Sequence, residues 1–118
     1  EFMEGDLLGS ILKENSFDYI IALDCLEHIE NMDEYILAFS KLLKPKGIII
    51  VSGPSENLFY KLGRILAGST FNGEYHVSNI TMIRKQFSRE FKVRSVKKLY
   101  YPFVLFEIFT ASNNKLRP

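Results

Sequence analysis

Two short apolar runs along the chain have the composition of β-strands. Residues 17–23 read Phe-Asp-Tyr-Ile-Ile-Ala-Leu, and residues 48–51 read Ile-Ile-Ile-Val. Both runs are rich in β-branched or aromatic residues, and neither alternates between polar and apolar positions, which is typical of parallel strands covered on both faces. We therefore predict two strands buried on both faces, the second of them central in its sheet.

The segment between these runs has helical periodicity. From about Asp33 to Leu43, apolar residues recur at steps of three and four, which predicts an amphipathic helix with Asn31 or Asp33 as its N-cap. The residues 44–47, Lys-Pro-Lys-Gly, are expected to form a turn, because proline disfavours helical dihedral angles in the residue before it. Strand, helix and strand within about 35 residues predict a right-handed βαβ unit.

Beyond the second strand, the pattern predicts a further helix and a loop. A helical stripe of apolar residues covers 58–66, with Ser55 available as a cap before it and Gly68 after it. A loop is expected over 69–76, because Asn-Gly and the small polar residues around it are typical of turns.

The last part of the chain predicts a short helix and a pair of strands. The helix is expected from Ser78 or Asn79 to about Phe87, with Met82, Ile83 and Phe87 on its buried face. The β-prone runs 91–100 and 103–111 are separated by Pro102 and are expected to pair in antiparallel fashion.

Composition narrows the class of protein. The 118 residues are 47% hydrophobic and 25% charged with a net charge of +1, which is the profile of one soluble globular domain. The most apolar stretch, residues 100–109, is about half of the roughly 20 residues of a membrane-spanning helix and is interrupted by Pro102 and Glu107, so no span is expected. The single Cys25 excludes a disulfide framework and favours a cytoplasmic location. Glu1-Phe2 before Met3 is typical of a cloning remnant.

Charge is divided unevenly between the two halves of the chain. Residues 1–52 carry a net charge of −6 and residues 53–118 a net charge of +7. The basic residues between Arg84 and Lys98 match no nucleic-acid recognition module, so we interpret them as a solvated face and expect no nucleic-acid partner. A dipolar chain of this kind could also attract an anionic ligand to its second half or a second copy of itself.

Candidate chemistry follows the two predicted parallel strands, whose carboxyl ends are where α/β sheets bind ligands. After the first strand, residues 24–28 bring two carboxylates and an imidazole that could act as acid, base or ligand holder, or could be an ordinary polar loop. After the second, residues 52–57 could hold an anion at a helix N-terminus. Cys25 lies among acidic residues, which argues against an activated thiolate, and His76 is most simply a surface residue. No metal-ligand spacing is present, so no metal is predicted.

The same segments carry a family resemblance. Gly5-Asp6, residues 17–29 with their Leu-Glu-His-Ile, and residues 41–51 with their Leu-Lys-Pro-Lys-Gly occur in the order and spacing of the second half of a class I S-adenosylmethionine-dependent methyltransferase. The similarity covers about Gly5 to Pro54. It implies a truncated Rossmann-like α/β sheet of about four strands, with a parallel βαβ core, a C-terminal antiparallel pair and flanking helices. The chain as a whole would be a single partial domain.

Site roles are implied by this resemblance alone. Asp6 matches the acidic residue that holds the adenine amino group of S-adenosylmethionine, and Leu7 its neighbour near the adenine ring. Ala22, Leu23 and Asp24 match the strand end that borders the methionine part of the cofactor, and His28 matches a position that flanks the cofactor pocket. If methyl transfer needs a base, the resemblance favours His28 and then Asp24.

The family's glycine-rich loop has no counterpart in these residues, since the chain contains no Gly-x-Gly. The resemblance therefore implies a methyltransferase for a small-molecule acceptor that is inactive as this isolated chain and binds S-adenosylmethionine weakly. The apolar and aromatic residues in 58–76 would suit an apolar or aromatic acceptor. An alternative is a non-catalytic methyltransferase-like fragment that acts as an interaction module, whereas a dehydrogenase is disfavoured because Leu-Glu-His-Ile is not one of its motifs.

An exposed strand edge is a further implication. In the complete fold the strand 17–23 would lie in mid-sheet, so here it should form an uncovered parallel edge with an apolar sequence. Uncovered edges of this kind pair with other chains. We therefore expect a homodimer through this edge or the adjoining face, or a dimer that swaps an element.

Overall fold

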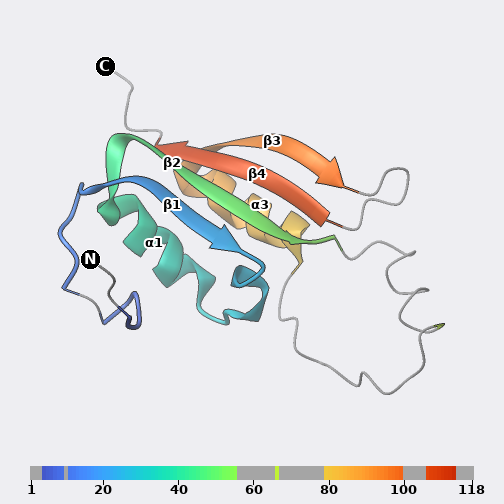
Figure 1. The fold of residues 1–118 in the computed structure, drawn as a ribbon, viewed down its shortest axis with the longest axis horizontal. Helices are drawn as coiled ribbons and strands as arrows, with labels where there is room; N and C mark the ends of the chain where they lie inside the picture. Colours follow the sequence, from blue (N-terminus) through green and yellow to red (C-terminus); the bar gives the residue numbers. More distant parts are fainter. Residues whose placement is uncertain (1–3, 10, 56–65, 67–78, 100–105, 114–118) are drawn as a thin grey trace.

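A computed structural model describes residues 4–9, 11–55, 66, 79–99 and 106–113 of the chain. Figure 1 shows a sheet flanked by helices. In chain order the elements are β1 (Phe17–Leu23), the short 3-10 helix η1 (Leu26–His28), α1 (Met32–Leu42), β2 (Leu43–Pro54), α3 (Ile80–Glu90), β3 (Phe91–Leu99) and β4 (Phe106–Asn113). The predicted α/β class is confirmed.

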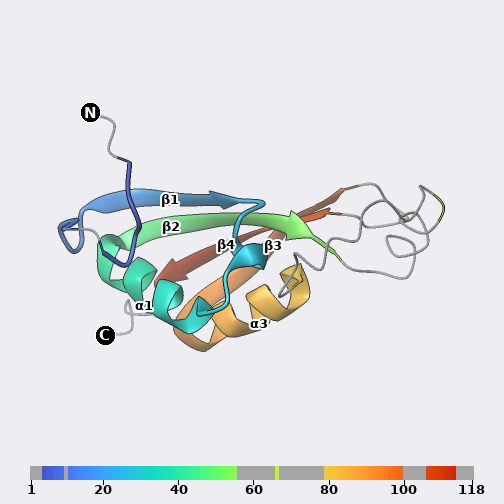
Figure 2. The same cartoon turned by 90° about the horizontal axis from the view of Figure 1, so that it is seen from below.

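The four strands form one mixed sheet in the order β1-β2-β4-β3. β1 and β2 are parallel, and β4 pairs in antiparallel fashion with both β2 and β3, which confirms the predicted βαβ core and antiparallel pair. Both α1 and α3 lie on the same face of the sheet (Figure 2). In the described part of the chain no helix covers the opposite face, which we call the bare face.

The bare face corrects the prediction that the first strand is buried on both sides. Ala22 of β1 is buried against the helices, whereas Tyr19, Ile21 and Leu23 are 64%, 63% and 56% exposed. The register continues this face onto Ile48 and Ile50 of β2, so the apolar surface spans two strands. β1 therefore has the sequence of a strand that is buried on both faces, but the described residues cover only one of its faces.

Helix α1 follows the predicted stripe closely. It begins at Met32 after the N-cap Asn31 and buries Ile36 and Phe39. It ends at Leu42, one residue before the predicted end, because Leu43 already has extended dihedral angles.

The predicted turn over residues 44–47 is wrong, because these residues lie inside β2. The register jumps there: Phe17 is opposite Leu43, but Tyr19 is opposite Ile48, so β2 accommodates its extra residues as a bulge. Gly47 fits this bulge because a Cβ atom would lie 2.6 Å from Leu43 Cδ1 and 3.0 Å from the Phe17 carbonyl oxygen. The glycine therefore allows a close approach of backbone to side chain at the start of β2, where the chain turns back from α1 into the sheet (Figure 1).

Helix α3 has the predicted cap and a different buried face. The Asn79 side chain accepts a hydrogen bond from the Met82 amide at 3.0 Å, which confirms Asn79 as the N-cap. The helix runs to Glu90, three residues beyond the predicted end. Met82 is 53% exposed, so its assignment to the buried face is wrong, and Ile80 occupies that face with Ile83 and Phe87.

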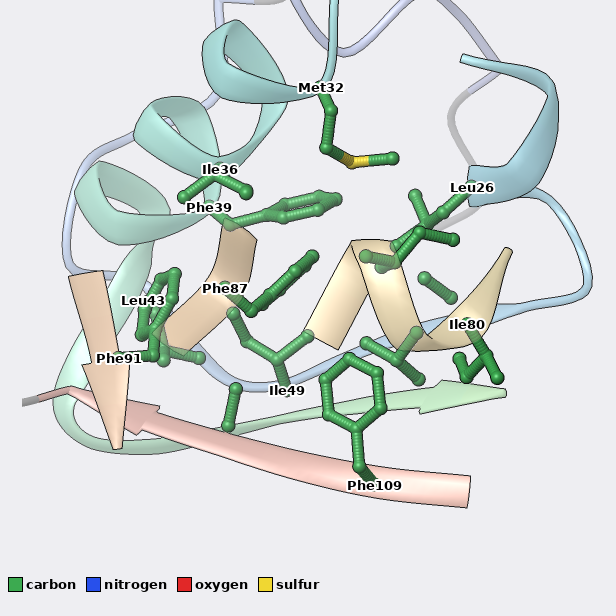
Figure 3. Packing of buried hydrophobic residues seen from close by; sticks show 14 residues of the cluster. Leu26, Met32, Ile36, Phe39, Leu43, Ile49, Ile80, Phe87, Phe91 and Phe109 are labelled. Carbon is green, nitrogen blue, oxygen red and sulfur yellow. The ribbon is translucent and has the colours of Figure 1, made fainter. Parts of the chain in front are cut away.

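The core lies between the sheet and the two helices, as Figure 3 shows. At its centre the Phe87 ring lies 6.2 Å from that of Phe39, 5.8 Å from that of Phe91 and 5.6 Å from that of Phe109, measured between ring centroids. These aromatic contacts join α1, α3, β3 and β4 into one unit.

Several predictions fall outside the described residues. They are the helix over 58–66 apart from Leu66, the loop over 69–76 with His76, and the connection around Pro102. In the described residues, strands β3 and β4 match the predicted runs 91–100 and 103–111, and β4 ends two residues later than predicted. No helix in the part of the chain described by the structure is long and apolar enough to cross a membrane.

Candidate functional site

The carboxyl ends of β1 and β2 are joined by hydrogen bonds between Asp24 and Ser52. The Asp24 amide donates to the Ser52 carbonyl oxygen at 3.2 Å, and the Ser52 hydroxyl donates to Asp24 Oδ1 at 2.9 Å. Asp24 has a φ of 49°, in the left-handed region that aspartate tolerates better than most residues. This backbone conformation ends β1 and holds a carboxylate at the edge where parallel sheets bind ligands.

Glu27 and His28 follow directly in η1, with contrasting exposure. Glu27 is only 3% exposed, whereas half of the His28 side chain is accessible. Glu27 Oε1 lies 3.9 Å from His28 Nε2, and Glu27 Oε2 is buried without a hydrogen-bond partner among the described residues. Burying a carboxylate without hydrogen-bond partners costs free energy. The loop nevertheless keeps the buried Glu27 carboxyl group next to the accessible imidazole of His28.

The thiol between these acids is not activated. Burial raises the pKa of Cys25, and the carboxylates of Glu27 and Asp24 raise it further. Both effects disfavour the thiolate, which confirms the inference drawn from the acidic neighbours of Cys25.

Asp6 and Leu7 lie beside α1. Asp6 Oδ1 accepts hydrogen bonds from the Leu8 amide at 3.1 Å and from the Tyr35 hydroxyl at 3.4 Å, and Leu7 packs against the core. Burial and then the nearby Asp6 carboxylate raise the pKa of Tyr35. Asp6 itself is exposed, so its carboxylate remains accessible to a ligand.

The predicted site residues form two groups in the structure. One group, Asp24 and His28, follows the end of β1, and the other, Asp6 and Leu7, is held by α1 through Tyr35. Ala22 points into the core, so only its backbone can border a ligand, while Leu23 belongs to the bare face. In the described part of the chain, no group of three or more His, Cys, Asp or Glu side chains could hold a metal ion.

Three features of the site were not predicted from the sequence. Residues 24–28 and 52–57 were both identified as candidates, but the bond between Ser52 and Asp24 and the burial of Glu27 were not expected. The contact of Tyr35 with Asp6 was not expected either. The pairing of Ser52 with Asp24 depends on the parallel register, in which Leu23 is opposite Ser52. A correct register would have revealed that pair, whereas no local signal reveals the Tyr35 contact across 29 residues.

Comparisons with known proteins agree with this architecture. A family model described as "Methyltransferase domain" matches residues 6–102. Among curated proteins, ubiquinone biosynthesis O-methyltransferases are similar: that of Rickettsia bellii is 44% identical over 39 residues, 33% of this chain and 16% of the relative. That of Rickettsia canadensis is 43% identical over 58 residues, 48% of this chain and 25% of the relative.

Solved structures share the fold over nearly the whole chain. A protein from Pyrococcus horikoshii has a TM-score of 0.74 at 19% identity, with 96% of this chain and 59% of that chain covered. Magnesium protoporphyrin IX methyltransferase from Synechocystis, solved with bound SAH, has a TM-score of 0.66 at 24% identity, with 95% and 50% covered. The chain thus spans little more than half the length of these structures.

The match over residues 6–102, together with the shared fold, shows that this chain belongs to the methyltransferase domain family, as its resemblance to class I S-adenosylmethionine-dependent methyltransferases implied.

Proposed function

We propose that this chain forms one side of the active site of an S-adenosylmethionine-dependent methyltransferase that acts on a small-molecule acceptor. The observation that carries the proposal is the cluster at the carboxyl ends of β1 and β2, where Asp24 is fixed by Ser52 and followed by an accessible His28. The similarity to ubiquinone biosynthesis O-methyltransferases supports a hydroxyl oxygen as the acceptor atom.

The residues present fit part of the cofactor. An exposed carboxylate such as Asp6 can accept hydrogen bonds from an adenine amino group, and Leu7 offers an apolar neighbour. When bound, S-adenosylmethionine would supply an electrophilic methyl group. The chain holds no Gly-x-Gly to bind the methionine part, so we expect weak cofactor binding and no activity from these 118 residues alone.

In the proposed reaction, His28 is the base that accepts the proton of the acceptor hydroxyl. A half-exposed imidazole can accept the proton of an acceptor hydroxyl as that oxygen attacks the methyl group, and the Asp24 carboxylate is the second candidate base. The remaining task of the site is to align the reacting atoms, for which a rigid strand end is well suited. An apolar or aromatic acceptor remains our proposal, as does a cytoplasmic location.

The bare face favours a second candidate function, that of an interaction module. The β1 edge is unpaired in the described residues, and its apolar side chains Tyr19, Ile21 and Leu23 are more than half exposed. An apolar parallel edge of this kind favours association. We propose that the isolated chain forms a homodimer, or a swapped dimer, through β1 and the adjoining face.

An assay of methyl transfer tests the enzymatic proposal. The part of the Rickettsia canadensis relative that precedes the matched region would be fused before Asp6, and the fusion assayed with S-adenosylmethionine and an alkylated phenol as an apolar aromatic acceptor. We expect methyl transfer to the phenol oxygen, and a rate at least about a hundredfold lower for His28→Asn because general-base catalysis is lost.

Glu30→Gln is the matched control, because Glu30 is exposed two residues beyond His28. Its rate should equal that of the unmodified fusion. A folded fusion without methyl transfer would contradict the enzymatic proposal and favour the interaction module. Equal rates for His28→Asn and Glu30→Gln would remove His28 from the chemistry.

A further inference from the structure

A groove lies between α3 and β3 on the helical side of the sheet. It has a volume of about 450 Å³, within the range of small-molecule pockets, and is lined by Thr81, Arg84, Lys85, Ser88, Val93 and Ser95. The four residues from α3 lie at steps of three, one and three and so share one face of the helix. This face adjoins the buried face of Ile80, Ile83 and Phe87 without being part of it.

Arg84 is held in place from beneath the groove. Its Nη1 donates to Glu107 Oε1, and the same carboxylate oxygen accepts from the Ser95 hydroxyl at 3.0 Å. The Glu107 side chain is 8% exposed and that of Arg84 is 41% exposed. A guanidinium carries five N–H donors in a rigid fork, so the bond through Nη1 restrains its orientation and leaves other donors on a residue that lines the groove.

The remaining lining groups determine which ligand fits. Ser88 donates to the Lys85 carbonyl oxygen at 2.8 Å, and Ser95 donates to Glu107, so toward a ligand these two hydroxyl oxygens can only accept. Lys85 and Thr81 also line the groove and carry donors. The cationic donors of Arg84 and Lys85 are therefore the groups that would hold an acceptor-rich anion.

The residues that line the groove carry two cations, Arg84 and Lys85, and the Glu107 carboxylate that anchors Arg84 offsets one of them. Lys98 is opposite Glu107 in the register and so lies on the same face of the sheet. The local charge is therefore positive and favours an anion. A phosphate monoester carries close to two negative charges near neutral pH, which makes it a strongly attracted candidate.

We propose that this groove binds the phosphoryl group of a phosphate monoester, with Arg84 and Lys85 as its principal donors. The site is separate from the cluster after β1, because Glu107 belongs to β4, two strands from β1, and the groove lies on the far side of α3 from α1. The proposal does not depend on the methyltransferase activity.

An NMR titration of the 118-residue chain with inorganic phosphate at constant ionic strength tests the site. Saturable shifts are expected for the amides of Thr81, Arg84, Lys85 and Ser95. Lys85→Gln should raise the phosphate Kd about tenfold or more, as expected for loss of a charge-assisted hydrogen bond. The double variant Arg84→Gln/Glu107→Gln removes the anchored cation without leaving Glu107 buried and unpaired, and it should abolish saturable binding.

Arg94→Gln is the matched control, since Arg94 lies opposite Thr110 and therefore on the bare face of β3. Arg94→Gln should change the phosphate Kd by less than about twofold, because exposed charges outside a site are screened at physiological ionic strength. Equal weakening by Lys85→Gln and Arg94→Gln would show general electrostatic attraction and overturn the proposal, as would shifts that fail to saturate.

Two sources of the phosphoryl group are then distinguished with vesicles that contain phosphatidic acid. Sedimentation with these vesicles that is displaced by inorganic phosphate and lost in Lys85→Gln supports the site and assigns a lipid headgroup. Phosphate binding without sedimentation supports the site and assigns a soluble phosphate ester. Sedimentation without saturable phosphate binding contradicts the groove as the site.

Discussion

Phe87→Ala is expected to lower the free energy of unfolding by about 3–5 kcal/mol, the usual cost of removing a buried phenylalanine ring. Phe87 is fully buried, and its ring contacts those of Phe39, Phe91 and Phe109 from three other elements. A domain of ordinary stability has only about 5–15 kcal/mol in total, so the variant should be largely unfolded at moderate denaturant concentrations. Urea unfolding followed by circular dichroism measures the difference.

Met82→Ala is the control on the same helix. Met82 is 53% exposed, so its truncation should change stability by less than about 0.5 kcal/mol. Similar losses from Phe87→Ala and Met82→Ala would contradict the position of α3 against the sheet.

Ile21→Lys is expected to convert a dimer of the isolated chain into a monomer. Ile21 is 63% exposed at the centre of the bare face, opposite Ile50 of β2. If this face is buried between two copies, each lysine ammonium would lose its water without a partner, so the dimer Kd should rise at least about a hundredfold. Sedimentation equilibrium over a range of concentrations measures this change.

Leu37→Lys provides the matched control for Ile21→Lys. Leu37 is 53% exposed on α1, which lies on the opposite side of the sheet, so the substitution adds the same charge at a site of similar exposure. It should leave the dimer Kd within about threefold of its original value, because an exposed charge outside the interface contributes little to association. A dilute, well-folded monomer of the unmodified chain would contradict association through the bare face.

The elements that were predicted correctly are those whose signals are local. The apolar run of β1 and the Asn79 cap of α3 lie within a few residues of the structure that they specify. The bulge around Gly47 was mistaken for a turn, because the same Lys-Pro-Lys-Gly sequence can reverse the chain or widen a strand. Which of the two conformations forms depends on the contact with Phe17, which lies far away in the sequence.

Burial was harder to predict than secondary structure. The sequence of β1 is that of a strand covered on both faces, and only the placement of α1 and α3 shows which face has the cover. Met82 was placed inside because the helical stripe was read with Met82 instead of Ile80. In the structure Ile80 packs against Gly53, where an added Cβ atom would lie 3.1 Å from Ile80 Cδ1. This close packing places the face of α3 that carries Ile80 toward the sheet and leaves Met82 outside.

In the candidate site, too, local features were predicted and contacts between distant residues were not. Residues 24–28 were identified because they follow a strand, which is a local signal. The hydrogen bond from Ser52 to Asp24 joins residues 28 positions apart, and the bond from Tyr35 to Asp6 joins residues 29 apart. The roles of Asp6, Leu7, Ala22, Leu23, Asp24 and His28 toward a cofactor remain predictions from family resemblance.

Calorimetric titration of S-adenosylmethionine tests the central claim most directly. The isolated chain should bind S-adenosylmethionine too weakly, or not at all, for its heat to saturate, because it contains no Gly-x-Gly for the methionine part of the cofactor. The fusion with the preceding part of the Rickettsia canadensis relative should bind one equivalent, and Asp6→Ala in that fusion should raise the Kd at least about tenfold through loss of a charge-assisted hydrogen bond. Equal affinities for the fusion and its Asp6→Ala variant would contradict the claim that this chain supplies the adenine side of the site.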